Sequence, residues 1–163
     1  MPLDEELKWY MFKQNKFKKD SLSFEKYKEY WVLTSQSVVE GGRPTIVVPP
    51  LRLIPFEDKD QLKETLCEIL DEEVAVIPGA VFDDPEFVVD ESYKLDALGL
   101  KSMRAFNKYS RGFWLKRFDA NLHLEEWEKY RGGGYTGTLW SKDFPPDDFE
   151  GLVNYLVEKV KDD

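Results

Sequence analysis

The sequence has almost none of the residues on which the commonest catalytic and metal sites depend. Its 163 residues include one cysteine, Cys67, and one histidine, His123. A single cysteine excludes an intramolecular disulfide, and the separation of Cys67 from His123 gives no zinc-site spacing. We therefore predict no metal and no cofactor. Because Cys67 lies within an amphipathic pattern, we expect it to be a small buried side chain.

Long apolar runs and an excess of basic residues are also missing. The longest apolar stretch, Thr45-Ile-Val-Val-Pro-Pro-Leu51, is far shorter than a membrane-spanning helix requires. Residues 1–6 are acidic and lack the basic and then apolar order of a secretion signal, so we expect a cytoplasmic protein. The net charge of −9 argues against nucleic acid or an anionic membrane as a partner, because phosphates are bound through lysine and arginine.

What the chain does contain is typical of a folded globular protein. Hydrophobic residues make up 42% and aromatic residues 15% of the sequence. The length is close to the commonest domain size, so we expect one domain spanning residues 1–163. Residues 1–29 mix lysines and aromatics without a clean period, and we regard them as an N-terminal extension.

Alternating and β-branched residues predict a series of short strands. Segment 30–39 is the first, 40–44 is a turn with two glycines, and 45–48 is a second strand. Pro49 and Pro50 should end that strand, because proline cannot donate to a ladder. The remaining predicted strands are 74–77, a strand marked by Phe113, Leu115 and Phe118, one marked by Leu122 and Leu124, and 135–140 after a glycine-rich turn at 131–135.

The sequence also predicts two amphipathic helices with capped starts. Asp58 should cap the first, with Gln61 three positions on. Asp147 should cap the second, where Glu150 follows and Gly151 implies a close packing contact. The expected buried stripes are Leu62, Leu66, Ile69 and Leu70 in the first helix, and Phe149, Leu152, Val153, Leu156 and Val160 in the second.

Two shorter helices complete the pattern. One covers 93–98 and is closed by Gly99. The other covers 102–109, with Met103, Phe106 and, as a further candidate, Tyr109 facing inward. The order of elements predicts an α+β fold, in which helices pack on one or both faces of an antiparallel or mixed sheet.

None of the remaining polar motifs predicts a catalytic site. His123 alternates with Leu122 and Leu124, which places it on the outer side of a strand. The run Gly132–Gly134 lacks the lysine and hydroxyl of a phosphate loop and is better interpreted as a turn. Four tryptophans fall in or beside predicted strands: Trp31, Trp114, Trp127 and Trp140. We expect most of them to be core or half-buried residues of the sheet, and the alternative is that one or two are exposed anchors of an interface.

The negative charge is concentrated in one stretch of the chain. Residues 57–96 contain fourteen acidic residues and three lysines, a net charge of −11. Three of these acids end the first predicted helix, where negative charge opposes the helix dipole, so local helix stability does not account for them. The stretch is either a solvated edge or a surface that mimics nucleic-acid charge for a basic partner.

Several segments between residues 30 and 160 resemble one known family. They are Val48-Pro-Pro-Leu-Arg-Leu-Ile-Pro55, Asp60-Gln-Leu-Lys-Glu-Thr-Leu-Cys-Glu-Ile-Leu70, Leu95-Asp-Ala-Leu-Gly-Leu-Lys-Ser-Met-Arg-Ala-Phe106 and Gly132-Gly-Gly-Tyr-Thr-Gly137, followed by the closing helix. This pattern is similar to the immunity proteins of bacterial contact-dependent growth inhibition systems. Residues 1–29 are outside the resemblance, and Met103 stands where the family has an aromatic.

The resemblance implies a protein that binds one cognate toxin domain, often a nuclease, and blocks its active site without catalysing a reaction. It carries over no catalytic residue and no cofactor. We predict from the charge that the toxin-binding residues are Asp71, Glu72, Glu73, Asp83, Asp84, Glu86, Asp90 and Glu91, because a nuclease site is basic. The alternatives are a small hydrolase that uses carboxylates or a metal, and a non-catalytic adaptor protein.

Overall fold

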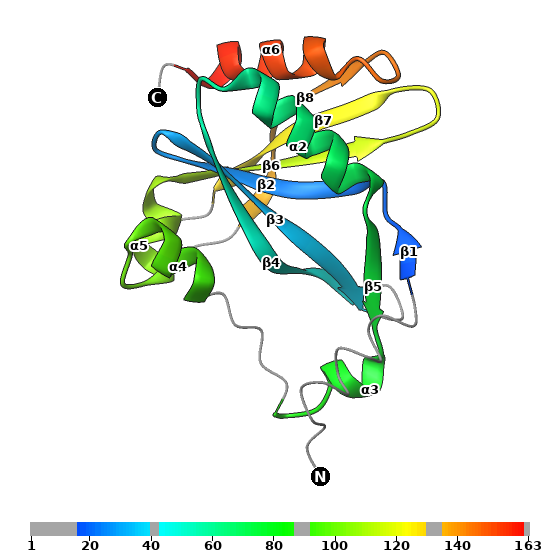
Figure 1. Ribbon diagram of the computed structural model, residues 1–163, viewed down its shortest axis with the longest axis vertical. Helices are drawn as coiled ribbons and strands as arrows, with labels where there is room; N and C mark the ends of the chain where they lie inside the picture. The colour runs from blue at the N-terminus through cyan, green and yellow to red at the C-terminus, as the bar shows by residue number, and fades with distance from the viewer. Residues whose placement is uncertain (1–15, 40–42, 87–91, 130–134, 162–163) are drawn as a thin grey trace.

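The computed structural model describes residues 16–39, 43–86, 92–129 and 135–161, whose strands form one mixed sheet (Figure 1). The strand order is β1-β5-β3-β2-β6-β7-β8, and β4 pairs with β3. All pairs are antiparallel except β3 with β5. The predicted α+β class is confirmed. The strands are β1 Lys16–Lys18, β2 Ser21–Tyr27, β3 Tyr30–Val39, β4 Arg43–Pro55, β5 Glu73–Ile77, β6 Ser110–Arg117, β7 Leu122–Lys129 and β8 Tyr135–Phe144.

Strand β2 occupies the middle of the sheet, although its sequence predicted no element. It pairs with β3 along 25–27 and with β6 along its whole length. Leu22 and Phe24 are buried on one face of the sheet, and Tyr27 is buried on the other. Lys26 interrupts the apolar alternation with a basic residue that is nevertheless buried, which is why the pattern was missed.

Strand β4 is much longer than predicted. The expectation that Pro49 and Pro50 end it is wrong, because pairing with β3 resumes beyond them and continues to Pro55. The register passes from Ser35 opposite Val48 to Thr34 opposite Leu51, so the two prolines fall in a bulge. A bulge requires no ladder hydrogen bond from these residues, which removes the reason for the strand to stop.

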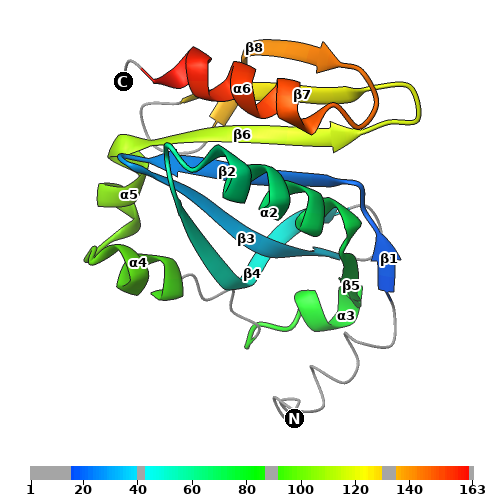
Figure 2. The ribbon, with the colours of Figure 1, turned by 45° about the horizontal axis from the view of Figure 1, so that its top comes forward.

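Helices α2 (Lys59–Asp71) and α6 (Phe149–Val160) cover one face of the sheet side by side, as Figure 2 shows. Asp58 caps α2 by accepting a hydrogen bond from the Gln61 amide at 3.1 Å, as predicted. Both predicted stripes are buried and pack on Leu22, Phe24 and Trp31. Cys67 is only half-buried beside this core, and burial raises the pKa of its thiol.

The start of α6 differs from the prediction by one residue. Asp148 is the cap, and its carboxylate accepts a hydrogen bond from the Gly151 amide at 3.0 Å. Asp147 instead has a left-handed backbone, with φ of 62°, so it makes the turn before the helix. A Cβ at position 151 would lie 2.4 Å from the Asp148 carboxylate, which is the close contact expected at Gly151.

The short helices pack against the opposite face of the sheet. These are α4 (Ser92–Leu98) and α5 (Met103–Tyr109), and Phe106 of α5 stacks on Tyr27 with ring centres 5.4 Å apart. Gly99 follows α4 with φ of 68°, as a helix-closing glycine should. Tyr109 is 51% exposed, so its expected inward position is wrong. Phe118, which was predicted to mark a strand, comes one residue after the end of β6 and is 45% exposed.

A further short helix, α3 (Gly79–Phe82), lies at the end of β5, at the bottom of Figure 1. Strand β8 runs four residues beyond its predicted end at Trp140. The turn predicted at 131–135 lies mostly outside the described residues. Within the described residues, no helix is long and apolar enough to span a membrane.

Candidate functional site

The end of α2 directs its three consecutive carboxylates to different surroundings. Asp71 is the last residue of the helix, and Glu72 is its C-cap, with an extended backbone and an amide that donates to the Ile69 carbonyl at 3.2 Å. Glu73 begins β5 immediately afterwards. The abrupt change from helix to strand therefore leaves Asp71 and Glu73 exposed and Glu72 half-buried.

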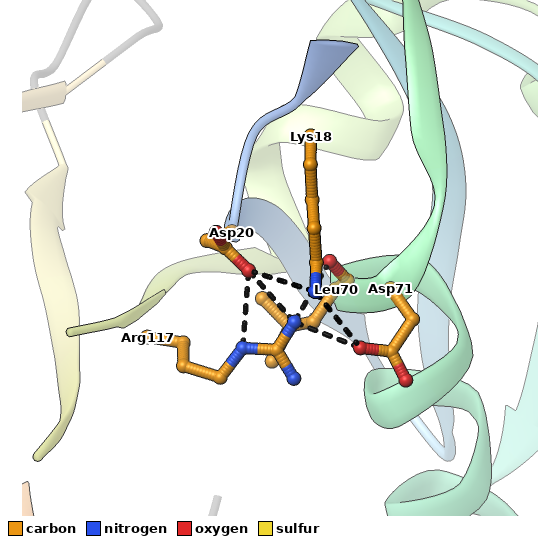
Figure 3. Close-up of polar contacts among 5 residues, drawn as sticks. All are labelled: Lys18, Asp20, Leu70, Asp71 and Arg117. Atoms are coloured by element: carbon orange, nitrogen blue, oxygen red, sulfur yellow. Dashed lines mark hydrogen bonds and ion pairs between the residues drawn. The ribbon is translucent and has the colours of Figure 1, made fainter. Parts of the chain in front are cut away.

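Asp71 belongs to an ion cluster centred on Arg117, the last residue of β6 (Figure 3). The Arg117 Nη2 donates to Asp71 Oδ1 at 2.8 Å and to Asp20 Oδ1 at 2.7 Å. The same nitrogen lies 3.3 Å from the carbonyl oxygen of Leu70, and Lys18 Nζ is 3.7 Å from both carboxylates. The cluster thus joins β1, the start of β2, α2 and β6.

The cluster gives the acidic helix end a structural role. Arg117 supplies a positive charge and a hydrogen-bond donor where the last carbonyls of α2 need them. The hydrogen bond from Arg117 is also the main reason why the pKa of Asp71 lies below its usual value. Even so, the Asp71 side chain is 62% exposed, so one side of the carboxylate remains open to a partner.

Beside the cluster the surface is hollowed by an open cleft of about 280 Å³. Its walls combine three of the cluster residues, Lys18, Asp20 and Arg117, with Asp119 and Asp147, and Phe118 and Pro146 supply the apolar part. Three aspartates face two basic side chains there, so the cleft is mildly acidic and suits a basic side chain from another protein.

The other predicted carboxylates follow β5 away from this cleft. Glu72 accepts a hydrogen bond from the buried Ser35 hydroxyl at 2.8 Å, which fixes it against the sheet. Glu73 is exposed and stands opposite Lys18 in the pairing of β1 with β5. The five residues of β5 span about 16 Å at roughly 3.3 Å per residue, and Asp83, Asp84 and Glu86 come beyond both this strand and α3.

The structure therefore divides the predicted set into two groups joined by β5. Asp71, Glu72 and Glu73 lie at its start, and Asp83, Asp84 and Glu86 lie beyond its end. In the second group, Asp84 accepts a hydrogen bond from the Glu86 amide at 2.9 Å. The predicted residues Asp90 and Glu91 lie outside the described residues.

Sequence reasoning missed the residues that organise this site. Lys18 and Asp20 lie 99 and 97 positions before Arg117, and no local spacing connects them. Asp20 has a left-handed backbone, with φ of 56°, which marks the tight corner between β1 and β2. Only a correct pairing of β2 with β6 brings Asp20 next to Arg117.

His123 is on the outer side of β7, as predicted, within a hydrogen-bonded row. Its Nδ1 lies 2.6 Å from Asp143 Oδ1, and its Nε2 lies 3.1 Å from Glu125 Oε2. Burial lowers the pKa of His123, but its hydrogen bonds to both carboxylates outweigh that effect and hold the pKa above its usual value. Across the described residues, no group of histidine, cysteine and carboxylate side chains is arranged to hold a metal ion.

Comparison with known proteins finds similarity at the level of the fold. No family model matches the sequence, and no curated protein matches it. A solved protein of unknown function from Neisseria meningitidis is similar with a TM-score of 0.62 and 13% identity, over 87% of this chain and 94% of that one. A chain of the CdiA-CT/CdiI toxin and immunity complex from Yersinia pseudotuberculosis is similar with a TM-score of 0.60 and 16% identity, over 89% of this chain and 98% of that one. These two proteins share the fold of this chain.

Proposed function

We propose that this chain is an immunity protein, which binds a cognate toxin domain in the cytoplasm and blocks its active site without catalysing a reaction. The observation that carries the proposal is the likeness in fold to a chain of a toxin and immunity complex, which extends over nearly the whole of both chains. The residue pattern between 30 and 160 points independently to the immunity partner of such a pair.

Charge supports a nuclease as the toxin. A nuclease site carries positive charge because its substrate is anionic, and an acidic protein approaches such a site quickly and fills it favourably. This chain has a net charge of −9, and its exposed carboxylates at Asp71, Glu73, Asp83 and Glu86 follow β5. We propose this strip, with the cleft beside Arg117, as the docking surface.

Co-expression tests the function directly. The toxin domain encoded beside this gene is induced in cells with and without this chain, and survival is counted. We expect the chain to restore growth and to co-purify with the toxin domain. Death of the cells despite abundant soluble chain contradicts the proposal, and so does toxicity of the chain when it is expressed alone.

A charge-reversal variant tests the docking surface separately. Glu73→Lys, Asp83→Lys and Glu86→Lys together should slow association with the toxin domain and reduce its dependence on salt. The matched control reverses three exposed acids elsewhere, Glu64, Asp96 and Glu128, and changes the net charge equally. Equal association rates for the two triple variants would exclude the strip while leaving the function intact.

A further inference from the structure

Three charged side chains from neighbouring strands meet on the α2 and α6 side of the sheet. Lys26 of β2 is paired with Arg111 of β6, and Glu126 lies on the adjoining strand β7. Arg111 Nε and Nη2 each donate to one oxygen of Glu126 at 2.6 Å, and Trp140 Nε1 donates to the same carboxylate at 2.8 Å. Glu126 is only 3% exposed, and its single negative charge faces two cations, Arg111, with which it pairs directly, and Lys26.

Lys26 is then a surplus positive charge. The residue is 7% exposed, and its ammonium lies 5.0 Å from the centre of the Phe56 ring. Among the described residues, none accepts a hydrogen bond from this ammonium. Burial, and then repulsion from Arg111, lower the pKa of Lys26, and attraction by Glu126 offsets only part of this lowering. Two cations share one buried carboxylate here, and because surplus buried charge is costly, the position favours an anion brought from outside.

A pocket of about 480 Å³ opens directly beside Lys26. Phe56, which stacks on Trp31 with ring centres 5.6 Å apart, and the 41%-exposed Tyr30 form its apolar walls. This volume is within the range of small-molecule sites, and five of the eight lining residues are charged. The pocket is remote from the cleft beside Arg117 and shares no lining residue with it.

The other charged residues of the pocket favour a ligand with one negative charge. Lys161 is engaged by Glu158 at 2.7 Å, and the Lys28 ammonium lies 4.9 Å from the Tyr109 ring centre on the other face. Glu29 and Glu57 also line the pocket. The lining therefore has three lysines against two glutamates, a net charge of +1, which suits a singly charged carboxylate better than a doubly charged phosphate.

We propose that this pocket binds a small carboxylic acid with a flat apolar body, whose carboxylate pairs with Lys26 and whose body lies against Phe56 and Tyr30. The site does not depend on toxin binding. It is a ligand site of the free chain, on a different part of the surface from the proposed docking strip.

Benzoate is a suitable probe, with benzamide as its neutral analogue. The full chain, labelled with ¹³C at the lysine side chains, is titrated with sodium benzoate at pH 7 and followed by NMR. We expect saturable shifts of the Lys26 Cε signal with a Kd of about 1 mM or tighter. Benzoate should also raise the pKa of Lys26, because a bound anion stabilises the ammonium. Benzamide should leave that pKa unchanged.

Variants establish which group holds the carboxylate. Lys26→Met keeps an unbranched apolar chain out to the ε position and removes only the ammonium, and it should weaken benzoate binding by about tenfold or more. Lys116→Met, on the opposite face of the sheet, should bind benzoate as the unmodified chain does. If Lys26→Met does not fold, the test is the pKa of Lys26 in the unmodified chain. A pKa that stays unchanged at a high concentration of benzoate overturns the proposal.

Two further outcomes would also overturn it. Tighter binding of inorganic phosphate than of benzoate would contradict the preference for one negative charge. A chain that ends at Lys161, without Asp162 and Asp163, provides the second control. If only that shortened chain binds benzoate, the chain's own end is the occupant and an external acid is not.

Discussion

Arg117 donates two hydrogen bonds, of 2.7 Å and 3.1 Å, to one carboxylate oxygen of Asp20, although the two residues are 97 positions apart in the sequence. With the contacts of Arg117 to Asp71 and Leu70, they form a bridge between the sheet and the end of α2. This bridge gives the first prediction on stability.

Arg117→Met should lower the free energy of unfolding by about 1 to 3 kcal/mol, because it leaves two carboxylates and a helix carbonyl without their donor. Urea denaturation measures the change, and Arg104→Met on an exposed position of α5 is the control. The folded pKa of Asp71 lies below its unfolded value, so its contribution is present above that unfolded value and is lost as the pH falls through the folded one. The difference between the two chains should therefore shrink on acidification; a constant difference would argue against the ion pair.

His123 should make stability depend on pH in the opposite sense. Its folded pKa is above its usual value of 6.5. The favourable contribution is therefore complete below pH 6.5 and is lost as the pH rises through the folded pKa. His123→Gln should destabilise the chain at pH 5.5 by up to about 1 kcal/mol and much less at pH 8.5. Denaturation at the two pH values checks this, and an equal loss at both would show that His123 acts by packing alone.

The start of α6 predicts different outcomes for two neighbouring aspartates. Asp148→Ala should destabilise the chain by about 1 kcal/mol, because the Gly151 amide loses its acceptor. Asp147→Gly should change stability by no more than about 0.5 kcal/mol, because glycine readily takes the positive φ found there. Thermal unfolding of both variants measures these changes in stability. A larger loss from Asp147→Gly would restore Asp147 as the cap.

Gly112 lies beneath the phenol ring of Tyr135. A Cβ at position 112 would approach the ring and its hydroxyl to 2.4 Å, so Gly112→Ala must push the ring away. Burial, the largest influence, raises the pKa of Tyr135 to about 12. In the variant this pKa should fall towards 10, which ultraviolet titration of the tyrosines measures against a Tyr135→Phe chain. Tyr135 should also lose its contact with Trp127, where the ring centres are 5.2 Å apart. An unchanged titration would mean that the sheet yields instead of the ring.

Local sequence patterns correctly predicted those helices and strands whose formation is determined mainly by residues within the same segment. The cap at Asp58 and the stripe of Leu62, Leu66, Ile69 and Leu70 define α2 without reference to the rest of the chain. Strand β2 was missed because its lysine at position 26 is accommodated by residues distant in the sequence, on β6 and β7 and at Phe56 after β4. The prolines of β4 misled for a related reason, since only the register with β3 reveals the bulge.

The candidate site was predicted in composition but not in arrangement. Charge counting identified Asp71 and its neighbours as unusual for a helix end. It gave no indication that Arg117 and Lys18 would balance part of that charge, because those residues come from distant segments. Charge counting also treated Glu73 and Asp83 as parts of one acidic cluster. They lie in different groups because the extended strand β5 begins at Glu73 and leads away from the end of α2.

The position of β2 has a consequence for synthesis of the chain. Leu22 pairs with Leu115, so the second strand to leave the ribosome must wait for the sixth before its apolar face is enclosed. Pairings this distant close slowly and leave strand edges open to other chains in the interval. We therefore expect the growing chain to need protection from aggregation until β6 has emerged, and stalled chains that end before residue 110 to be captured by chaperones.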